Sequence, residues 1–194
     1  EADAYVGNRA VVIYTIEKDL LTNLQVMGRS LQDPIVLTIG LRKDWPELLP
    51  ILNRALASIS QDEYRAIRRK WTSLEDAAQI FMPDTILTVE EKDWLVKHRR
   101  IRIGVDIQHP PYNFMDAAKT HSGIASDYVN LVNRRLDVEM YTEPAANWNE
   151  TLEKTRQGDI DVLPCIAQTP ARSEYLLFTQ PYLRAPLVIL TRED

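Results

Sequence analysis

Residues 101–106 read Ile-Arg-Ile-Gly-Val-Asp, and this short stretch decides the fold. Its β-branched apolar residues end at a glycine and an acidic residue, which is typical of a buried strand that runs into a loop. Strands and helices then alternate along the chain. We expect them at residues 123–136 (helix), 138–141 (strand), 148–157 (helix), 160–163 (strand) and 186–191 (strand). This alternation predicts βαβ units, and therefore an open, mostly parallel α/β sheet with helices on both faces.

Two more strand-like runs and a helix precede this unit. Residues 11–16 and 35–41 are β-branched and apolar enough to be buried strands. Asp44 and Glu47 have the spacing of a capping box, which predicts a helix from about Trp45.

The helical pattern continues at residues 61–71, and the periodicity then weakens. Residues from about 73 to 89 include Pro83 and are interpreted as the start of a connector. Thr88 followed by Glu91 predicts a capped short helix at its end. The chain is therefore divided into residues 1–72, a connector at 73–100, and residues 101–194.

Composition and charge exclude several classes of protein. The 194 residues are 45% hydrophobic and 26% charged, as in soluble globular chains, so disorder is excluded. The net charge of -5 predicts no nucleic-acid partner. With one cysteine, Cys165, and three histidines without ligand-like spacing, we expect no metal site and no cofactor. No apolar run approaches the roughly 20 residues of a membrane helix, so any membrane attachment would come from segments outside this chain.

Several motifs occur in the order and spacing of a known family. They are Ile-Arg-Ile-Gly-Val-Asp at 101–106, Pro-Pro-Tyr-Asn-Phe at 110–114, Gly-Asp-Ile-Asp-Val-Leu-Pro at 158–164 and Thr-Pro-Ala-Arg at 169–172. Residues 101–194 resemble the first lobe of family 3 solute-binding proteins, also called Venus-flytrap modules. The fold implied is that of a periplasmic-binding-protein type II lobe. Thr-Pro-Ala-Arg-Ser-Glu-Tyr-Leu-Leu-Phe-Thr at 169–179 resembles the tandem sensor modules of hybrid sensor histidine kinases and diguanylate cyclases.

The first 72 residues resemble the same family out of order. Residues 3–8 are similar to the end of a second lobe, and residues 35–71 to the segment that crosses back to complete a first lobe. In the longer protein these parts would belong to successive clamshells. In the isolated chain, 35–71 could complete 101–194, either as a circularly permuted lobe or in a domain-swapped homodimer. We favour this completion because a sheet without its return strand would expose an apolar edge.

The resemblance implies a ligand in the cleft between lobes, and it points to six residues. His109, Tyr112 and Phe114 would form an aromatic wall, although the same rings could instead pack the loop onto its own lobe. Arg172 would hold a ligand carboxylate, assisted by Thr169; the alternative is that Thr169 caps a short helix and Arg172 is solvated.

Asn8, the sixth residue, stands where amino-acid receptors of the family have the aspartate that binds the ammonium group. Residues 164–167 also lack the serines of such receptors, so the ligand class, amino acid or carboxylate, stays open. Asp159 and Asp161 are interpreted as a turn followed by a strand, and not as an acid–base pair.

The leading hypothesis is a non-catalytic, periplasmic module that senses a small-molecule ligand by cleft closure, within a protein anchored in the inner membrane. The alternatives are a ligand-free packing or dimerisation module, a transport receptor, and a periplasmic enzyme of the same fold.

Overall fold

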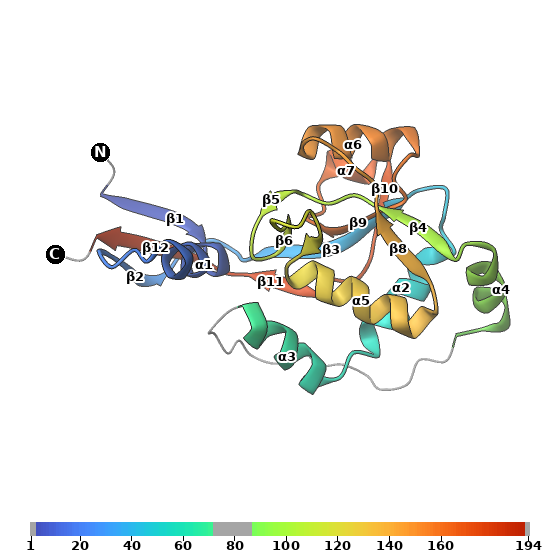
Figure 1. The fold of residues 1–194 in the computed structure, drawn as a ribbon, viewed down its shortest axis with the longest axis horizontal. Helices are drawn as coiled ribbons and strands as arrows, with labels where there is room; N and C mark the ends of the chain where they lie inside the picture. Colours follow the sequence, from blue (N-terminus) through green and yellow to red (C-terminus); the bar gives the residue numbers. More distant parts are fainter. Residues whose placement is uncertain (1–2, 72–86, 193–194) are drawn as a thin grey trace.

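The computed structural model describes residues 3–71 and 87–192 (Figure 1). Its helices are α1 (Arg9–Asp19), α2 (Leu48–Ala57), α3 (Gln61–Trp71), α4 (Val89–Lys97), α5 (Ile124–Leu136), α6 (Trp148–Gln157) and α7 (Pro170–Ser173). Its strands are β1 (Ala4–Asn8), β2 (Leu24–Arg29), β3 (Ile35–Arg42), β4 (Arg100–Ile103), β5 (Gln108–His109), β6 (Asn113–Met115), β7 (His121–Ser122), β8 (Glu139–Thr142), β9 (Val162–Ile166), β10 (Leu176–Phe178), β11 (Leu183–Ala185) and β12 (Leu187–Arg192).

The main sheet is open and has helices on both faces, as in a periplasmic-binding-protein type II lobe. Its strand order is β10-β3-β9-β4-β8, and β11 also pairs with β3. Helices α6 and α7 lie on one side of it, with α2 and α5 on the other (Figure 1). Neighbouring β9 residues show how the two faces are filled: Val162 belongs to the larger core with α2 and α5, and Leu163 to the smaller core with α6.

Parallel pairing is confined to one half of the sheet. Strand β4 runs parallel to β8 and β9, as the βαβ pattern predicts, whereas β3 runs antiparallel to β9, β10 and β11. The sheet is therefore mixed. Strand β3 follows β2 of the second, smaller sheet directly, with no helix between them.

Strand β3 lies inside the sheet and not beside it. Residues 35–42 pair on one side with β9, through Thr38 opposite Ile166, and on the other with β10 and β11. Leu41 is fully buried there. Within this chain, the segment at 35–71 thus packs with residues 101–192; the division of the longer protein into successive modules stays a prediction.

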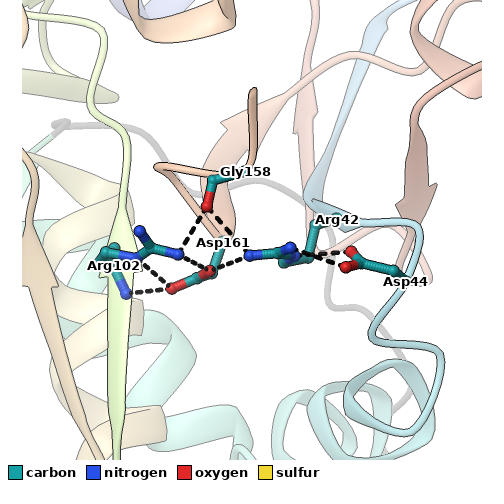
Figure 2. A network of polar contacts seen from close by, with 5 residues as sticks. All are labelled: Arg42, Asp44, Arg102, Gly158 and Asp161. Atoms are coloured by element: carbon teal, nitrogen blue, oxygen red, sulfur yellow. Dashed lines mark hydrogen bonds and ion pairs between the residues drawn. The ribbon is translucent and has the colours of Figure 1, made fainter. Parts of the chain in front are cut away.

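A buried carboxylate joins β3 to the rest of the lobe (Figure 2). Asp161, 1% exposed, accepts hydrogen bonds from Arg42 Nη1 at 2.9 Å and from the Arg102 side chain at 2.7 and 3.0 Å. The Gly158 carbonyl accepts from both guanidinium groups, at 3.1 and 2.7 Å. Residues from three parts of the chain are therefore fixed at one turn, which agrees with a structural role for Asp161.

The expected capping box of Asp44 with Glu47 is wrong. Both Asp44 carboxylate oxygens accept from the Arg42 guanidinium, at 2.6 and 2.7 Å, and this ion pair lowers the pKa of Asp44. Helix α2 begins at Leu48, and no side chain caps its first turn. Because the Asp44 carboxylate is paired with Arg42, it does not cap the helix as the local pattern predicted.

The second sheet is small and has the order β1-β12-β2, with α1 beside it (Figure 1). The expected strand at 11–16 is wrong, because these residues lie in α1. The Asn8 side chain caps this helix by accepting from the backbone N–H groups of Ala10 and Val11, at 3.0 and 3.5 Å. Ala10 and Val12 are buried, so helical burial outweighs the β-branched composition.

The part of the connector that the structure describes is α4, while residues 72–86, including Pro83, lie outside the described residues. The predicted capping box of Thr88 with Glu91 is confirmed. Trp94 stacks on His98 at 3.9 Å between ring centroids, and Trp45 meets Trp94 edge-on at 5.3 Å. These rings hold α4 against the loop that leads into α2.

Candidate functional site

A cavity of about 610 Å³ opens at the carboxyl ends of β4 and β8, which run parallel. Open α/β sheets place ligands at this edge, and the volume lies in the range of small-molecule sites. Its lining combines five apolar residues with four polar ones: Val105, Ile107, Met115, Pro144 and Ala145, and Gln108, Lys119, Thr142 and Glu143.

The loop after β4 is held by the amino terminus of α5. The backbone N–H groups of Ile124 and Ala125 donate to the carbonyls of Pro111 and Tyr112, at 2.9 and 2.8 Å. Gly123, with a φ of 110°, makes this close approach possible, because an added Cβ would lie 2.7 Å from the Tyr112 carbonyl oxygen. The Pro110–Pro111 peptide bond in this loop is cis.

The hairpin β6–β7 supplies another wall, and its turn is built around Asp116. The Asp116 carboxylate accepts the backbone N–H groups of Ala118 and Thr120, both at 2.9 Å. Lys119 donates its own N–H to the Asp116 carbonyl at 2.9 Å and has a φ of 58°. This is the left-handed region, which favours glycine.

At the base of the same hairpin, the half-buried His121 contacts the buried Asn113. His121 Nε2 is 2.7 Å from the Asn113 side-chain oxygen, and burial lowers the pKa of His121 to about 4. The imidazole is therefore neutral at neutral pH.

Tyr112 and Asn8 contact each other. The Tyr112 ring is 1% exposed, and its hydroxyl donates to Asn8 Oδ1 at 3.0 Å. The same oxygen caps α1, so Asn8 joins the small sheet to the loop after β4. Ligand binding by either residue stays a prediction.

The other two rings of the expected aromatic wall also have neighbours within the chain. Phe114 lies edge-on to Trp71, 5.9 Å between centroids, and 6.3 Å from the Tyr14 ring. His109 lies 5.4 Å from the Tyr112 ring, and burial lowers the pKa of His109. Trp71 donates to Asp127 at 2.6 Å, which places Asp127 in a structural contact at the start of α5.

Thr169 and Arg172 lie together after β9. The Thr169 hydroxyl oxygen accepts the backbone N–H of Arg172 at 3.3 Å and caps α7, with Pro170 in its first turn. Arg172 Nη1 donates to the Ala167 carbonyl at 2.8 Å. The capping geometry is thus present, and binding of a carboxylate by Arg172 stays a prediction.

None of the six predicted residues lines the cavity at β4 and β8, although Gln108 and Met115 are neighbours of His109 and Phe114. The sequence reasoning did not select Lys119 or Glu143. For Glu143, the available signal was its position two residues after the predicted strand at 138–141. For Lys119, no local sequence pattern predicted a lysine in the left-handed backbone conformation.

Among the described residues, no group of histidine, cysteine and acidic side chains could hold a metal ion. Cys165 is buried, which raises the pKa of its thiol to about 12. None of the helices at 3–71 and 87–192 is long and apolar enough to cross a membrane.

This arrangement, an open α/β lobe with a cavity at the carboxyl ends of its parallel strands, is the fold of a periplasmic-binding-protein type II lobe. Residues 101–194, just under half of the chain, match the family of bacterial extracellular solute-binding proteins, family 3.

Sensor proteins are among its relatives. The chain is 22% identical over 194 residues to the virulence sensor protein BvgS of Bordetella pertussis (strain Tohama I), covering 100% of this chain and 16% of the relative. It is 20% identical to the sensor protein EvgS of Escherichia coli (strain K12), covering 98% of this chain and 16% of that protein. The chain thus spans about one sixth of the length of these relatives.

A solved structure is also similar. It is the arginine-bound form of domain 1 from TmArgBP, in its Phe57Trp mutant. The identity is 22%, the TM-score is 0.42, and the match covers 53% of this chain and 84% of that one.

Proposed function

We propose that this chain is part of a periplasmic module that senses a small solute, within a signalling protein anchored in the inner membrane. The solute binds at the carboxyl ends of β4 and β8 and favours a closed arrangement of lobes, and this differential affinity shifts a signalling equilibrium. The module itself is non-catalytic. Its family and its sensor relatives support this reading.

The observation that carries the proposal is the cavity. It lies where open α/β sheets bind ligands, and its wall is mainly apolar with a few polar groups, as in small-molecule sites. Its surrounding loops are fixed by backbone hydrogen bonds, so the site is preformed within the lobe.

The test is a thermal-shift screen of the 194-residue chain against amino acids, small carboxylates and aromatic acids at about 10 mM. A solute with a Kd of about 1 mM would stabilise the chain by about 1.4 kcal/mol, which corresponds to roughly 3–5 °C at this size. The substitution Ala145→Trp fills the cavity and should abolish the shift. The matched control is Ala146→Trp, on the next residue, which does not line the cavity and should keep it. A shift that survives Ala145→Trp would refute this location.

A second candidate function is a packing element that binds no solute. It is favoured by the internal partners of Tyr112, Phe114 and Arg172, whose polar groups or rings already contact Asn8, Trp71 and the Ala167 carbonyl. If it is correct, no solute shifts the melting temperature, and in the longer protein Ala145→Trp leaves signalling unchanged.

A further inference from the structure

We propose that strand β1 is a docking edge for a second copy of this chain, and that the β1 strands of two copies pair antiparallel about a two-fold axis at Tyr5. The small sheets of the two copies then form one continuous sheet. No segment is exchanged between the copies, which distinguishes this dimer from a domain-swapped one. Solute binding is not involved, because no residue of β1 lines the cavity at β4 and β8.

The backbone of β1 presents hydrogen-bonding groups on its outer side. In the small sheet, β1 is the terminal strand, next to β12 (Figure 1). The Arg9 N–H donates to the Pro186 carbonyl at 2.8 Å, in register with the rest of the β1–β12 ladder. Antiparallel ladders bond alternate residues, so residues 5 and 7 face β12 as Arg9 does. The N–H and C=O groups of Ala4 and Val6 therefore face outward, where an added strand would pair with them.

The other sheet edges of the described chain are protected against pairing, and β1 is not. A register shift opposite Ile189 and Leu190 interrupts β2, and β8 begins with Glu139, which pairs with Arg100 at 3.1 Å. Strands β10 and β11 have three residues each, and β5 and β7 have two. Bulges, charges and short strands are the devices that prevent edge-to-edge association. Strand β1 reads Ala-Tyr-Val-Gly-Asn, without a charge, a proline or a register shift.

Symmetry and charge favour a second β1 as the added strand. With the axis at Tyr5, Ala4 of each copy lies opposite Val6 of the other, so each outward N–H meets an outward C=O. The two Tyr5 side chains face each other in a non-hydrogen-bonded pair, where side chains approach most closely. Tyr5 and Val6 are 60% and 46% exposed, so both have apolar surface to bury. Asp3 precedes the strand and Arg9 follows it, so antiparallel pairing brings opposite charges toward each other.

The oligomeric state of the 194-residue chain tests the proposal. Sedimentation equilibrium from about 10 μM to 1 mM covers the affinity of a small interface and should show the mass rising from 22.3 kDa toward twice this value. Val6→Pro should abolish the dimer, because it removes an outward N–H and no bond to β12, and edge strands tolerate proline at such a position.

A lysine variant keeps the test decisive if the proline variant does not fold, as judged by circular dichroism. Val6→Lys should raise the dissociation constant of the dimer at least roughly tenfold, because a lysine on an edge strand opposes pairing. Val26→Lys is the matched control. Val26 is 39% exposed and lies on β2, at the opposite edge of the same small sheet, so the dimer should persist in this variant.

A cysteine variant tests the position of the two-fold axis. Tyr5→Cys should give a disulfide-linked dimer on mild oxidation, because the Cβ atoms of a non-hydrogen-bonded pair come close to disulfide distance. Met27→Cys, on β2, is the control, since Met27 is 63% exposed and Tyr5 60%. The native Cys165 is buried and does not compete. Cross-linking should be at least roughly tenfold faster at position 5 than at position 27, because pairing raises the local thiol concentration.

Three results would overturn the proposal. The first is a chain that stays monomeric over the whole concentration range. The second is a dimer that persists in the folded Val6 variants or cross-links equally at positions 5 and 27. The third is a series of species larger than a dimer, because head-to-tail pairing of β1 with β2 leaves free edges and forms open chains.

Discussion

Replacing Asp161 with asparagine should lower the free energy of unfolding by about 3 kcal/mol, the lower end of the range for removing one partner of a buried ion pair. Its carboxylate is 1% exposed and accepts from Arg42, from the Arg102 side chain and from the Arg102 backbone N–H at 2.9 Å. Asparagine has one acceptor oxygen and turns an amide donor toward guanidinium donors. The lower end applies because the Arg42 and Arg102 side chains are 20% and 31% exposed, so water recovers part of their solvation.

The measurement is urea unfolding followed by tryptophan fluorescence, with an unchanged denaturant slope as evidence of an intact native state. Asp159→Asn is the matched control, because it alters an exposed carboxyl in the same turn and should change stability by less than about 0.5 kcal/mol. Asp44→Asn, on the 64% exposed partner of Arg42, should cost no more than about 1 kcal/mol. Equal losses for Asp161→Asn and Asp159→Asn would refute the idea that the buried carboxylate holds β3 in the lobe.

Three further predictions follow from the loop after β4 and its surroundings. Because burial lowers the pKa of His121 to about 4 while the unfolded chain takes up this proton near pH 6.5, stability should be lost as the pH falls from 6.5 to 4. Between pH 7 and pH 4.5, the free energy of unfolding of His121→Gln should fall by up to about 3 kcal/mol less than that of the unsubstituted chain, as measured by urea unfolding. An equal pH dependence in the two proteins would contradict the assignment. Gly123→Ala should lower the free energy of unfolding by about 3 kcal/mol in the same assay, because the φ of this residue is 110° and the added Cβ would meet the Tyr112 carbonyl. A decrease below about 1 kcal/mol would show that the loop can shift. Cys165 should resist a thiol-specific disulfide reagent in the native protein and react only in urea, and rapid native labelling would show that the thiol is accessible.

Local sequence patterns predicted elements whose stabilising contacts are themselves local. The helix at Gln61–Trp71 and the capping box of Thr88 with Glu91 are confirmed, because the groups involved lie within one or two turns of each other. Residues 11–16 were predicted as a strand from their β-branched composition, but they lie in the helix at residues 9–19. The capping side chain of Asn8 was the sequence signal for this helix. The Asp44 error has another origin: the competing partner, Arg42, is local, but its position is fixed by Asp161, 119 residues away.

The candidate site was predicted only as a region. The resemblance led to the loop after β4, and the cavity does border this loop, yet its charged lining residues come from a hairpin turn and from the end of β8. No sequence rule places Lys119 and Glu143 in the lining of one cavity, because this depends on how the β6–β7 hairpin folds over the strand ends. Thr169 illustrates the opposite case, since its capping role is local and was one of the two readings that the sequence offered.

The position of β3 inside the sheet has a consequence for biosynthesis. Thr38 hydrogen-bonds to Ile166, 128 residues later, so the strand emerges from the ribosome long before the partner that flanks it. At usual elongation rates of about 5–20 residues per second, the interval between the synthesis of Thr38 and that of Ile166 is on the order of ten seconds. During this time an apolar strand, with Leu37, Ile39 and Leu41 destined for the core, has no neighbour on that side. The main sheet can therefore be completed only after residues 162–185 have been synthesised, and a nascent chain of this design gains from a holdase that shields its early strand.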